Sequence, residues 1–144
     1  MSQAAFESPV FDPLRLTAVS LDVQAVQRLG VAGIRARQGS RLRALVQAAR
    51  ARSRLYRELL PAVPPESGGH IELAALPVVS KAQLMQRFDD WVADPAIRQS
   101  ELQAFMADPQ RVGAPFLGRY VVWESSGSSG EQGLFVQDAR AMAV

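Results

Sequence analysis

Serines and glycines gather in one stretch near the end of the sequence, WESSGSSGEQG, residues 123–133. Its three glycines recur at three-residue spacing, so each can adopt a positive φ or let a ligand approach the backbone. Successive amides in such a turn can converge on one anion, and neighbouring hydroxyls can donate to phosphate oxygens. The residues predicted to form this phosphate site are Ser125, Ser126, Gly127, Ser128, Ser129 and Gly130.

Short runs of strand-forming residues flank this loop on both sides. Residues 120–123 (YVVW) precede it and residues 134–137 (LFVQ) follow it, so the loop is held at both ends. A flexible Gly/Ser spacer is not usually placed between two strands, although a hairpin turn that binds nothing has the same composition. Asp138 is the predicted N-cap of a helix that has run only to Val144 where the sequence ends.

The residues before the loop are predicted to be mainly helical, over residues 17–107. Residues 1–16 have two prolines and no periodicity, which predicts an extended arm. A helix should start at Thr17 and be interrupted at Gly30, and a second should start at Ser40 and stop before Pro61. The predicted apolar face of this second helix comprises Leu42, Leu45, Val46, Ala49, Ser53, Tyr56 and Leu60.

Further along, the pattern S-x-x-Q at Ser80 and Gln83 predicts a capping box at a helix start. Another helical segment should begin at Asp94-Pro95 and end at Asp108-Pro109. Trp91 and Trp123 are expected to be partly buried core aromatics. Together these elements predict an α+β chain, mainly α-helical in its N-terminal part, with a short β element near the C-terminus.

Composition excludes several classes of function. The chain of 144 residues has 48% hydrophobic and 21% charged residues, no cysteine, and neither a secretory leader nor an apolar run that could span a bilayer. We therefore expect one cytoplasmic domain, without a membrane or nucleic-acid partner. His70 is the single histidine, and a cation site formed by Asp89, Asp90 and Asp94 is disfavoured, so no metal site and no catalytic residue is predicted.

The basic residues are nearly all arginine, and eight of them fall between positions 35 and 57: Arg35, Arg37, Arg41, Arg43, Arg50, Arg52, Arg54 and Arg57. Such a stripe can bind a phosphate backbone, but the one aromatic residue among these arginines, Tyr56, falls on the predicted apolar face and not among the exposed arginines. A solvated helix face is the favoured interpretation. The alternative function for the chain is a non-enzymatic helical module that binds a protein or an anionic partner through this face.

The segment SSGSSG, residues 125–130, resembles the phosphate loop [ST]-[ST]-G-[ST]-[ST]-G-x-P of adenylate-forming enzymes. The preceding chain looks like the N-terminal region of the phenylacetate-CoA ligase branch. Three stretches support this likeness in order: RLRALVQAA at 41–49, LYRELL at 55–60 and LPVVSKAQL at 76–84. The resemblance covers about residues 40–137. Gln132 stands where the family has proline, and no lysine follows the loop.

The resemblance implies an ATP-dependent acid-CoA ligase that joins a carboxylate to AMP and transfers the acyl group to coenzyme A. ATP with Mg²⁺ and coenzyme A would then be the cofactors, and residues 17–144 the start of the enzyme domain, truncated after the phosphate loop. We expect the adenine, ribose and acyl sites of that fold to lie beyond Val144, so that this chain alone is inactive and binds ATP weakly at best. Without those elements, residues 120–137 should self-associate or be mobile.

Overall fold

The computed structural model describes residues 12–60, 71–125 and 132–142, and the chain divides into two compact units. One unit comprises residues 24–103, and the other comprises residues 1–23 and 104–144. Each is described by itself. The elements of the first unit are helical, and the second contains the only strands within the described ranges, as the α+β expectation requires.

Helix α1, Pro13–Arg28, begins earlier than the sequence predicts. Asp12 Oδ1 accepts a hydrogen bond from the amide of Arg15, and Pro13 occupies the first helical position, where its missing N–H costs nothing. The predicted extended arm is therefore wrong at residues 13–16, and its residues 1–11 lie outside the described part. Gly30, with φ of +66°, separates α1 from the next helix, as expected.

Helix α2, Gly30–Arg52, runs without interruption through Ser40, so the predicted helix start at Ser40 is wrong. Residues on both sides of Ser40 are mostly Ala, Arg, Leu and Gln, which favour continuation of a helix over a local serine cap. The helix ends instead at Ser53, whose backbone leaves the helical region (φ −107°, ψ 127°). Helix α3, Arg54–Leu59, follows at once, so the helix predicted over 40–60 is two helices.

Short elements complete the helical unit: η1 (Leu73–Ala75), α4 (Lys81–Gln86), α5 (Phe88–Trp91) and the start of α6 (Gln99–Met106). The predicted capping box is confirmed, with the Ser80 hydroxyl accepting from the Gln83 amide and the Gln83 side chain accepting from the Ser80 amide. Asp94-Pro95 forms a turn, because Asp94 Oδ1 accepts from the amide of Ala96 only two residues on. The helix predicted there begins four residues later, at Gln99.

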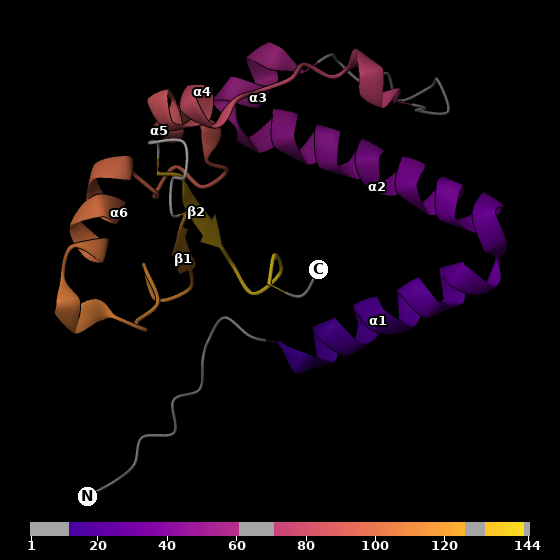
Figure 1. The fold of residues 1–144 in the computed structure, drawn as a ribbon, viewed down its shortest axis with the longest axis horizontal. Helices are drawn as coiled ribbons and strands as arrows, with labels where there is room; N and C mark the ends of the chain where they lie inside the picture. Colours follow the sequence, from indigo (N-terminus) through magenta and orange to yellow (C-terminus); the bar gives the residue numbers. More distant parts are fainter. Residues whose placement is uncertain (1–11, 61–70, 126–131, 143–144) are drawn as a thin grey trace, which may run out of the picture. The chain divides into compact units, whose positions relative to one another are not determined.

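The helices labelled α2, α3, α5 and α6 in Figure 1 each contribute one buried apolar side chain to the core of the helical unit, and the segment before α6 contributes another. Its fully buried apolar residues are Val46, Leu55, Phe88, Ile97 and Leu102. Leu45, predicted on the same face as Val46, is 66% exposed. Phe88 packs edge-on against Trp91, with ring centroids 5.8 Å apart.

In the other unit, α6 ends at Met106 and Asp108 caps the short helix η2, Pro109–Arg111, which confirms the predicted stop. Phe105 and Phe116 meet edge-on at 5.2 Å, and the Arg111 guanidinium lies over the Phe105 ring. Strand β1, Val121–Glu124, pairs antiparallel with β2, Leu134–Gln137. The second strand is as predicted, and the first is shifted by one residue because Tyr120 pairs with Phe116.

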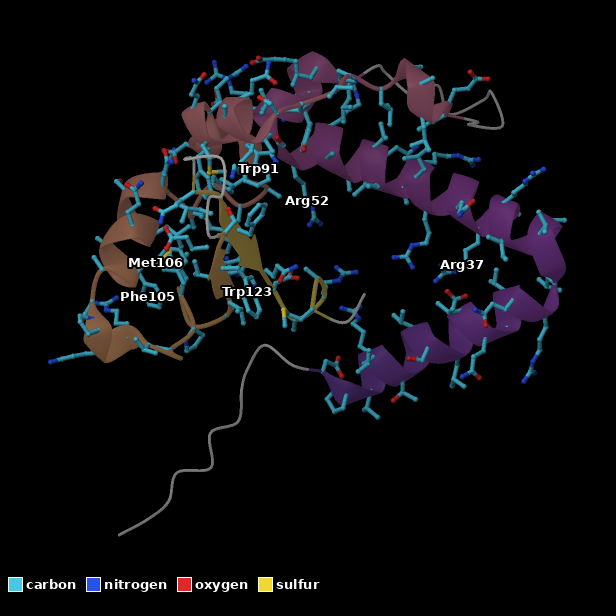
Figure 2. All side chains as sticks on the ribbon, viewed as in Figure 1. Arg37, Arg52, Trp91, Phe105, Met106 and Trp123 are labelled. Carbon is cyan, nitrogen blue, oxygen red and sulfur yellow. The ribbon has the colours of Figure 1, made fainter. Side chains whose placement is uncertain are left out.

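Trp123, labelled in Figure 2, is 49% exposed and thus only partly buried, and its cross-strand partner Phe135 lies on the same face of the two-stranded ribbon. The helix predicted to start at Asp138 is wrong. Asp138 does cap a turn, since its Oδ1 accepts from the amides of Arg140 and Ala141, but residues 139–142 form turns and no helix. A single turn lacks the length that makes a helix stable without packing.

Candidate functional site

The loop that carries the predicted phosphate site connects the two strands of the β1–β2 hairpin. Ser125 follows β1 directly and Gly133 precedes β2 directly, so these two residues form the neck of the loop. The Ser125 amide donates to the Gly133 carbonyl at 2.9 Å, and the Gly133 amide donates to the Ser125 Oγ at 2.9 Å. Both bonds extend the strand register by one residue pair and close the base of the loop.

Gly133 at this neck is buried, and Ser125 is half-buried. An unpaired amide at a buried position costs about 1–3 kcal/mol, so the Ser125 hydroxyl removes a penalty that any apolar side chain would leave. This use of Ser125 was missed from the sequence, where it counted as one of six equivalent phosphate ligands. Its oxygen lone pair is engaged by Gly133, and its hydroxyl proton is still available to a donor bond.

The other predicted site residues, Ser126, Gly127, Ser128, Ser129 and Gly130, lie outside the described residues. The structure therefore brings the two ends of the loop together. His70 also lies outside the described part. Gln132, which stands where the resembling family has proline, is exposed next to the neck.

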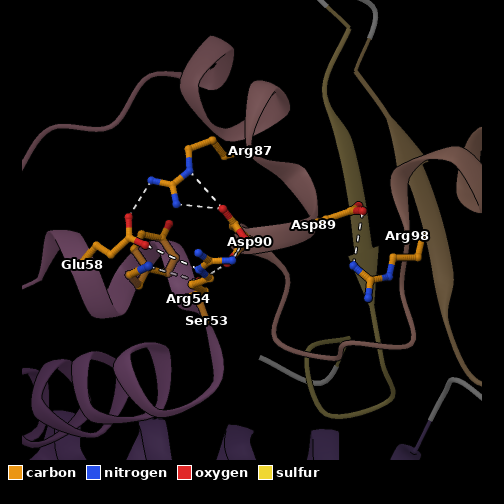
Figure 3. Close-up of polar contacts among 8 residues, drawn as sticks. Ser53, Arg54, Glu58, Arg87, Asp89, Asp90 and Arg98 are labelled. Atoms are coloured by element: carbon orange, nitrogen blue, oxygen red, sulfur yellow. Dashed lines mark hydrogen bonds and ion pairs between the residues drawn. The ribbon is translucent and has the colours of Figure 1, made fainter.

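A second cluster of polar groups lies among α3, α4 and α5, and the sequence did not reveal it (Figure 3). Arg87, which joins α4 to α5, donates to Glu58 of α3 at 2.7 Å and to the Oδ2 of Asp90 of α5 at 2.8 and 3.2 Å. Arg54 lies 3.7 Å from Glu58 and 3.6 Å from Asp90. The four side chains form one alternating network of two cations and two anions.

The network shifts the acidity of its members. The hydrogen bond from Arg87 is the main cause that lowers the pKa of Glu58, and the same donor lowers the pKa of Asp90. The two carboxylates in turn raise the pKa of Arg87. All members are at least partly exposed, and their charges cancel, so the cluster offers no unpaired group for a ligand.

Beneath this network, Ser53 joins two segments far apart in the sequence. Its hydroxyl donates to the carbonyl of Asp90 at 3.0 Å and accepts from the amide of Tyr56 at 3.2 Å, which caps α3. The side chain is 2% exposed. Nearby, the Trp91 indole donates to the Tyr56 hydroxyl at 3.3 Å. Ser53 is therefore a structural residue. This polar side chain can be buried on the predicted apolar face because its hydroxyl makes both hydrogen bonds.

The acidic group that a cation might use is also engaged. Asp89 accepts from the amide of Gln99 at 2.8 Å, at the start of α6, and lies 3.5 Å from Arg98. Asp90 belongs to the network above, and Asp94 holds its own turn. Among residues 12–60, 71–125 and 132–142, no group of three or more acidic, His or Cys side chains could hold a metal ion.

Several arginines of the predicted stripe serve the fold. Arg57 donates to the carbonyls of Arg50 and Ala51 near the end of α2. Arg50 donates to the carbonyls of Leu60 and Arg57 around the end of α3. Cations at helix C-termini satisfy carbonyls that lack an intrahelical partner and interact favourably with the helix dipole. The stripe is therefore not one uniform cationic surface.

None of the described helices is both long and apolar enough to cross a membrane. No family model matches the chain, and no curated protein and no solved structure shows significant similarity to it.

Proposed function

We propose that residues 125–130 bind the β- and γ-phosphates of ATP, as the phosphate loop of an enzyme that activates a carboxylate by adenylation. In the full reaction, a carboxylate oxygen attacks the α-phosphorus, pyrophosphate leaves, and the acyl group then passes to a thiol such as that of coenzyme A. The observation that supports this function is the closed neck, because Ser125 and Gly133 are the ends of a loop, residues 125–133, with four serines and three glycines between two strands.

A short neck matters to phosphate binding because it restricts the loop before the ligand arrives. Backbone amides and hydroxyls that are already restricted lose less conformational entropy when they bind an anion. The loop would orient the triphosphate and stabilise the charge that develops on pyrophosphate. Ser125 would hold the loop closed through Gly133, and the remaining residues of the loop would supply the donors.

The magnesium ion of the family would accompany the triphosphate in this proposal. The described residues contain no acidic cluster that could hold the ion independently. Mg²⁺ in nucleotide sites is usually held by one or two carboxylates together with the phosphates, so the triphosphate itself would supply part of the ion's coordination.

The test is equilibrium binding of ATP, tripolyphosphate, AMP and adenosine to the purified chain, measured by isothermal titration with Mg²⁺ present. A loop that recognises the β- and γ-phosphates should bind ATP and tripolyphosphate and should discriminate against AMP and adenosine. Loss of one hydroxyl donor to a phosphate costs about 1.5–3 kcal/mol. The Ser128→Ala variant should therefore bind tripolyphosphate at least tenfold more weakly.

A matched control is Ser100→Ala, an exposed serine in α6 that lies outside the loop. This variant should bind tripolyphosphate as the unmodified chain does. Equal affinity for adenosine and ATP, or equal loss in the two serine variants, would refute the proposed phosphate site.

A further inference from the structure

The charges of this chain are strongly segregated. Between Asp22 and Glu58 the sequence has nine arginines and no acidic residue. The rest of the chain has seven basic and fourteen acidic residues, so a segment of net charge +9 is joined to a remainder of −7. Helix α2 lies wholly inside the basic segment and contains six of these arginines.

Helix α2 exposes a mainly apolar stripe between Val31 and Leu45. Five residues spaced by three or four positions fall on one face of the helix: Val31, Ile34, Gln38, Leu42 and Leu45. Val31 and Leu45 are about two-thirds exposed, and Ile34 is 38% exposed. By contrast, Val46 near the other end of α2 is buried. The apolar side chains of the stripe are thus exposed to water, whereas Val46, on another face of the helix, is packed in the core.

Two arginines flank the stripe on opposite sides. At 3.6 residues per turn, Arg35 follows one edge of the stripe and Arg41 the other. Both are exposed, and within the described residues neither guanidinium makes a hydrogen bond or an ion pair. They differ in this from Arg50 and Arg57, which the fold uses at its helix ends.

We propose that the face of α2 formed by Val31, Ile34, Leu45, Arg35 and Arg41 binds an acidic amphipathic helix of a partner protein. Charge complementarity requires an anionic partner, and the 3-4 spacing of the apolar stripe fits a helix that carries apolar residues at the same period. Carboxylates on both sides of that partner's apolar stripe would meet Arg35 and Arg41.

Other occupants fit this face less well. A second copy of α2 would bring arginines against arginines. An anionic bilayer would have to take up the amide of Gln38 at the centre of the stripe, where lipid tails offer no hydrogen bond. Nucleic acid would contact the arginines but leave the apolar side chains exposed, and α2 has no aromatic residue on which a base could stack.

The helix itself gives an independent reason to expect a partner. It contains two internal glycines after its start, Gly33 and Gly39, and no acidic residue that could pair with arginines one turn away. Arg37 and Arg41, four positions apart, repel each other. A helix of this composition gains little stability from its own surface, so a bound acidic helix should raise its protection against amide exchange.

The test uses a fluorescein-labelled synthetic helix of about 21 residues with Leu at its a and d positions and Glu at e and g. Binding to the full chain is followed by fluorescence anisotropy at about 0.15 M salt. The proposal predicts saturable binding and increased amide protection over residues 31–45. A peptide with Ser in place of Leu, and the same Glu residues, should bind at least about tenfold more weakly, because the apolar contacts are lost.

Charge-reversal variants of the chain test whether Arg35 and Arg41 contribute to binding. The variant Arg35→Glu/Arg41→Glu should lose about tenfold or more in affinity, and a peptide with Lys at e and g should bind this variant better than it binds the unmodified chain. The control Arg15→Glu/Arg140→Glu makes the same change in net charge outside α2 and should change affinity by less than about threefold. Circular dichroism checks that both variants keep their helix content.

Two results would overturn the proposal. One is equal binding of the Leu and Ser peptides, which would mean that the apolar stripe takes no part. The other is binding of poly(U) RNA or of phosphatidylglycerol vesicles that depends on Arg35 and Arg41 while the acidic peptide does not bind.

Discussion

Two serines, Ser53 and Ser125, each hydrogen-bond to a distant or returning part of the chain, and they do so in different surroundings. Ser53 is fully buried and connects α3 to the carbonyl of Asp90, 37 residues along the chain. Ser125 is half-buried and connects the two ends of a single loop, eight residues apart. Around Ser53 the neighbouring polar groups bind one another, whereas around Ser125 the described hydrogen bonds fix only the neck. The first arrangement stabilises the helical unit, and the second closes the neck of the loop that we propose binds phosphate.

The largest expected effect concerns the core beside Ser53. Phe88 is 1% exposed and packs edge-on against Trp91, so Phe88→Ala should lower the free energy of unfolding by about 3–5 kcal/mol. Urea unfolding followed by tryptophan fluorescence measures the change. The control Val78→Ala removes a side chain that is 98% exposed and should stay within about 0.5 kcal/mol of the unmodified chain. Similar losses in both variants would show that the helical unit is not packed around Phe88.

Two serine caps provide the next comparison. The Ser53→Ala variant removes the cap of α3, leaves the part-buried amide of Tyr56 without that acceptor and loses the bond to the carbonyl of Asp90, at a cost of about 1–3 kcal/mol. Ser80 caps α4 with the same geometry but is exposed, so water can replace its bonds, and Ser80→Ala should cost about 0.5–1 kcal/mol. Urea midpoints of the two variants test the order. If Ser80→Ala lowered the free energy of unfolding more than Ser53→Ala, the difference in burial would not explain the relative strength of the two caps.

The ion-pair network should make the free energy of unfolding depend on pH in the acidic range. Because Arg87 lowers the pKa of Glu58 and Asp90 from their ordinary values of 4.5 and 3.8, their stabilising contribution is complete above those values. It is lost as pH falls through the lowered pKa values of the folded state. The urea midpoint should therefore fall more steeply with acid in the unmodified chain than in Arg87→Gln. The control Arg140→Gln should keep the steeper fall, and equal slopes in all three would contradict the network's role.

A smaller effect on stability is expected at the neck. Ser125→Ala removes the acceptor of the Gly133 amide, which should cost about 1 kcal/mol and raise the exchange rate of that amide. Ser125→Thr keeps the hydroxyl and should restore the protection. Hydrogen exchange at Gly133 separates the two variants. An amide that is equally protected in both would show that the Ser125 hydroxyl does not close the loop.

Local signals in the sequence predicted some elements well and others poorly, and three Asp-Pro pairs show why. Asp12-Pro13 begins α1, Asp94-Pro95 forms a turn, and Asp108-Pro109 begins η2. Each aspartate accepts a nearby backbone amide, but Asp12 reaches three residues on and Asp94 only two. Whether a helix follows depends on the residues beyond the cap, which a dipeptide cannot report.

The local helix starts predicted at Ser40 and Asp138 were wrong. Other predictions that needed only neighbours in the sequence were confirmed, including the Ser80–Gln83 capping box, strand β2 and the break at Gly30. Those that needed tertiary contacts failed or were not made. Leu45 was predicted on the same buried face as Val46, but no side chain in the described part of the chain covers it. The network of Arg54, Glu58, Arg87 and Asp90 joins segments 29 residues apart. The neck bond from Gly133 to Ser125 could have been inferred from the hairpin, because strand register places these two residues opposite each other.

The central claim is that the hairpin holds a loop for phosphate, and the amides at its neck report on it most directly. Nuclear magnetic resonance of the ¹⁵N-labelled chain, titrated with tripolyphosphate and with adenosine, follows the amides of Ser125 and Gly133 together with that of Gln83 as a distant reference. Tripolyphosphate should shift the amide signals of Ser125 and Gly133 in a saturable manner and leave that of Gln83 unchanged, whereas adenosine should shift none of the three. Saturation with tripolyphosphate that leaves both neck amides unmoved, or no binding of tripolyphosphate at all, would contradict it.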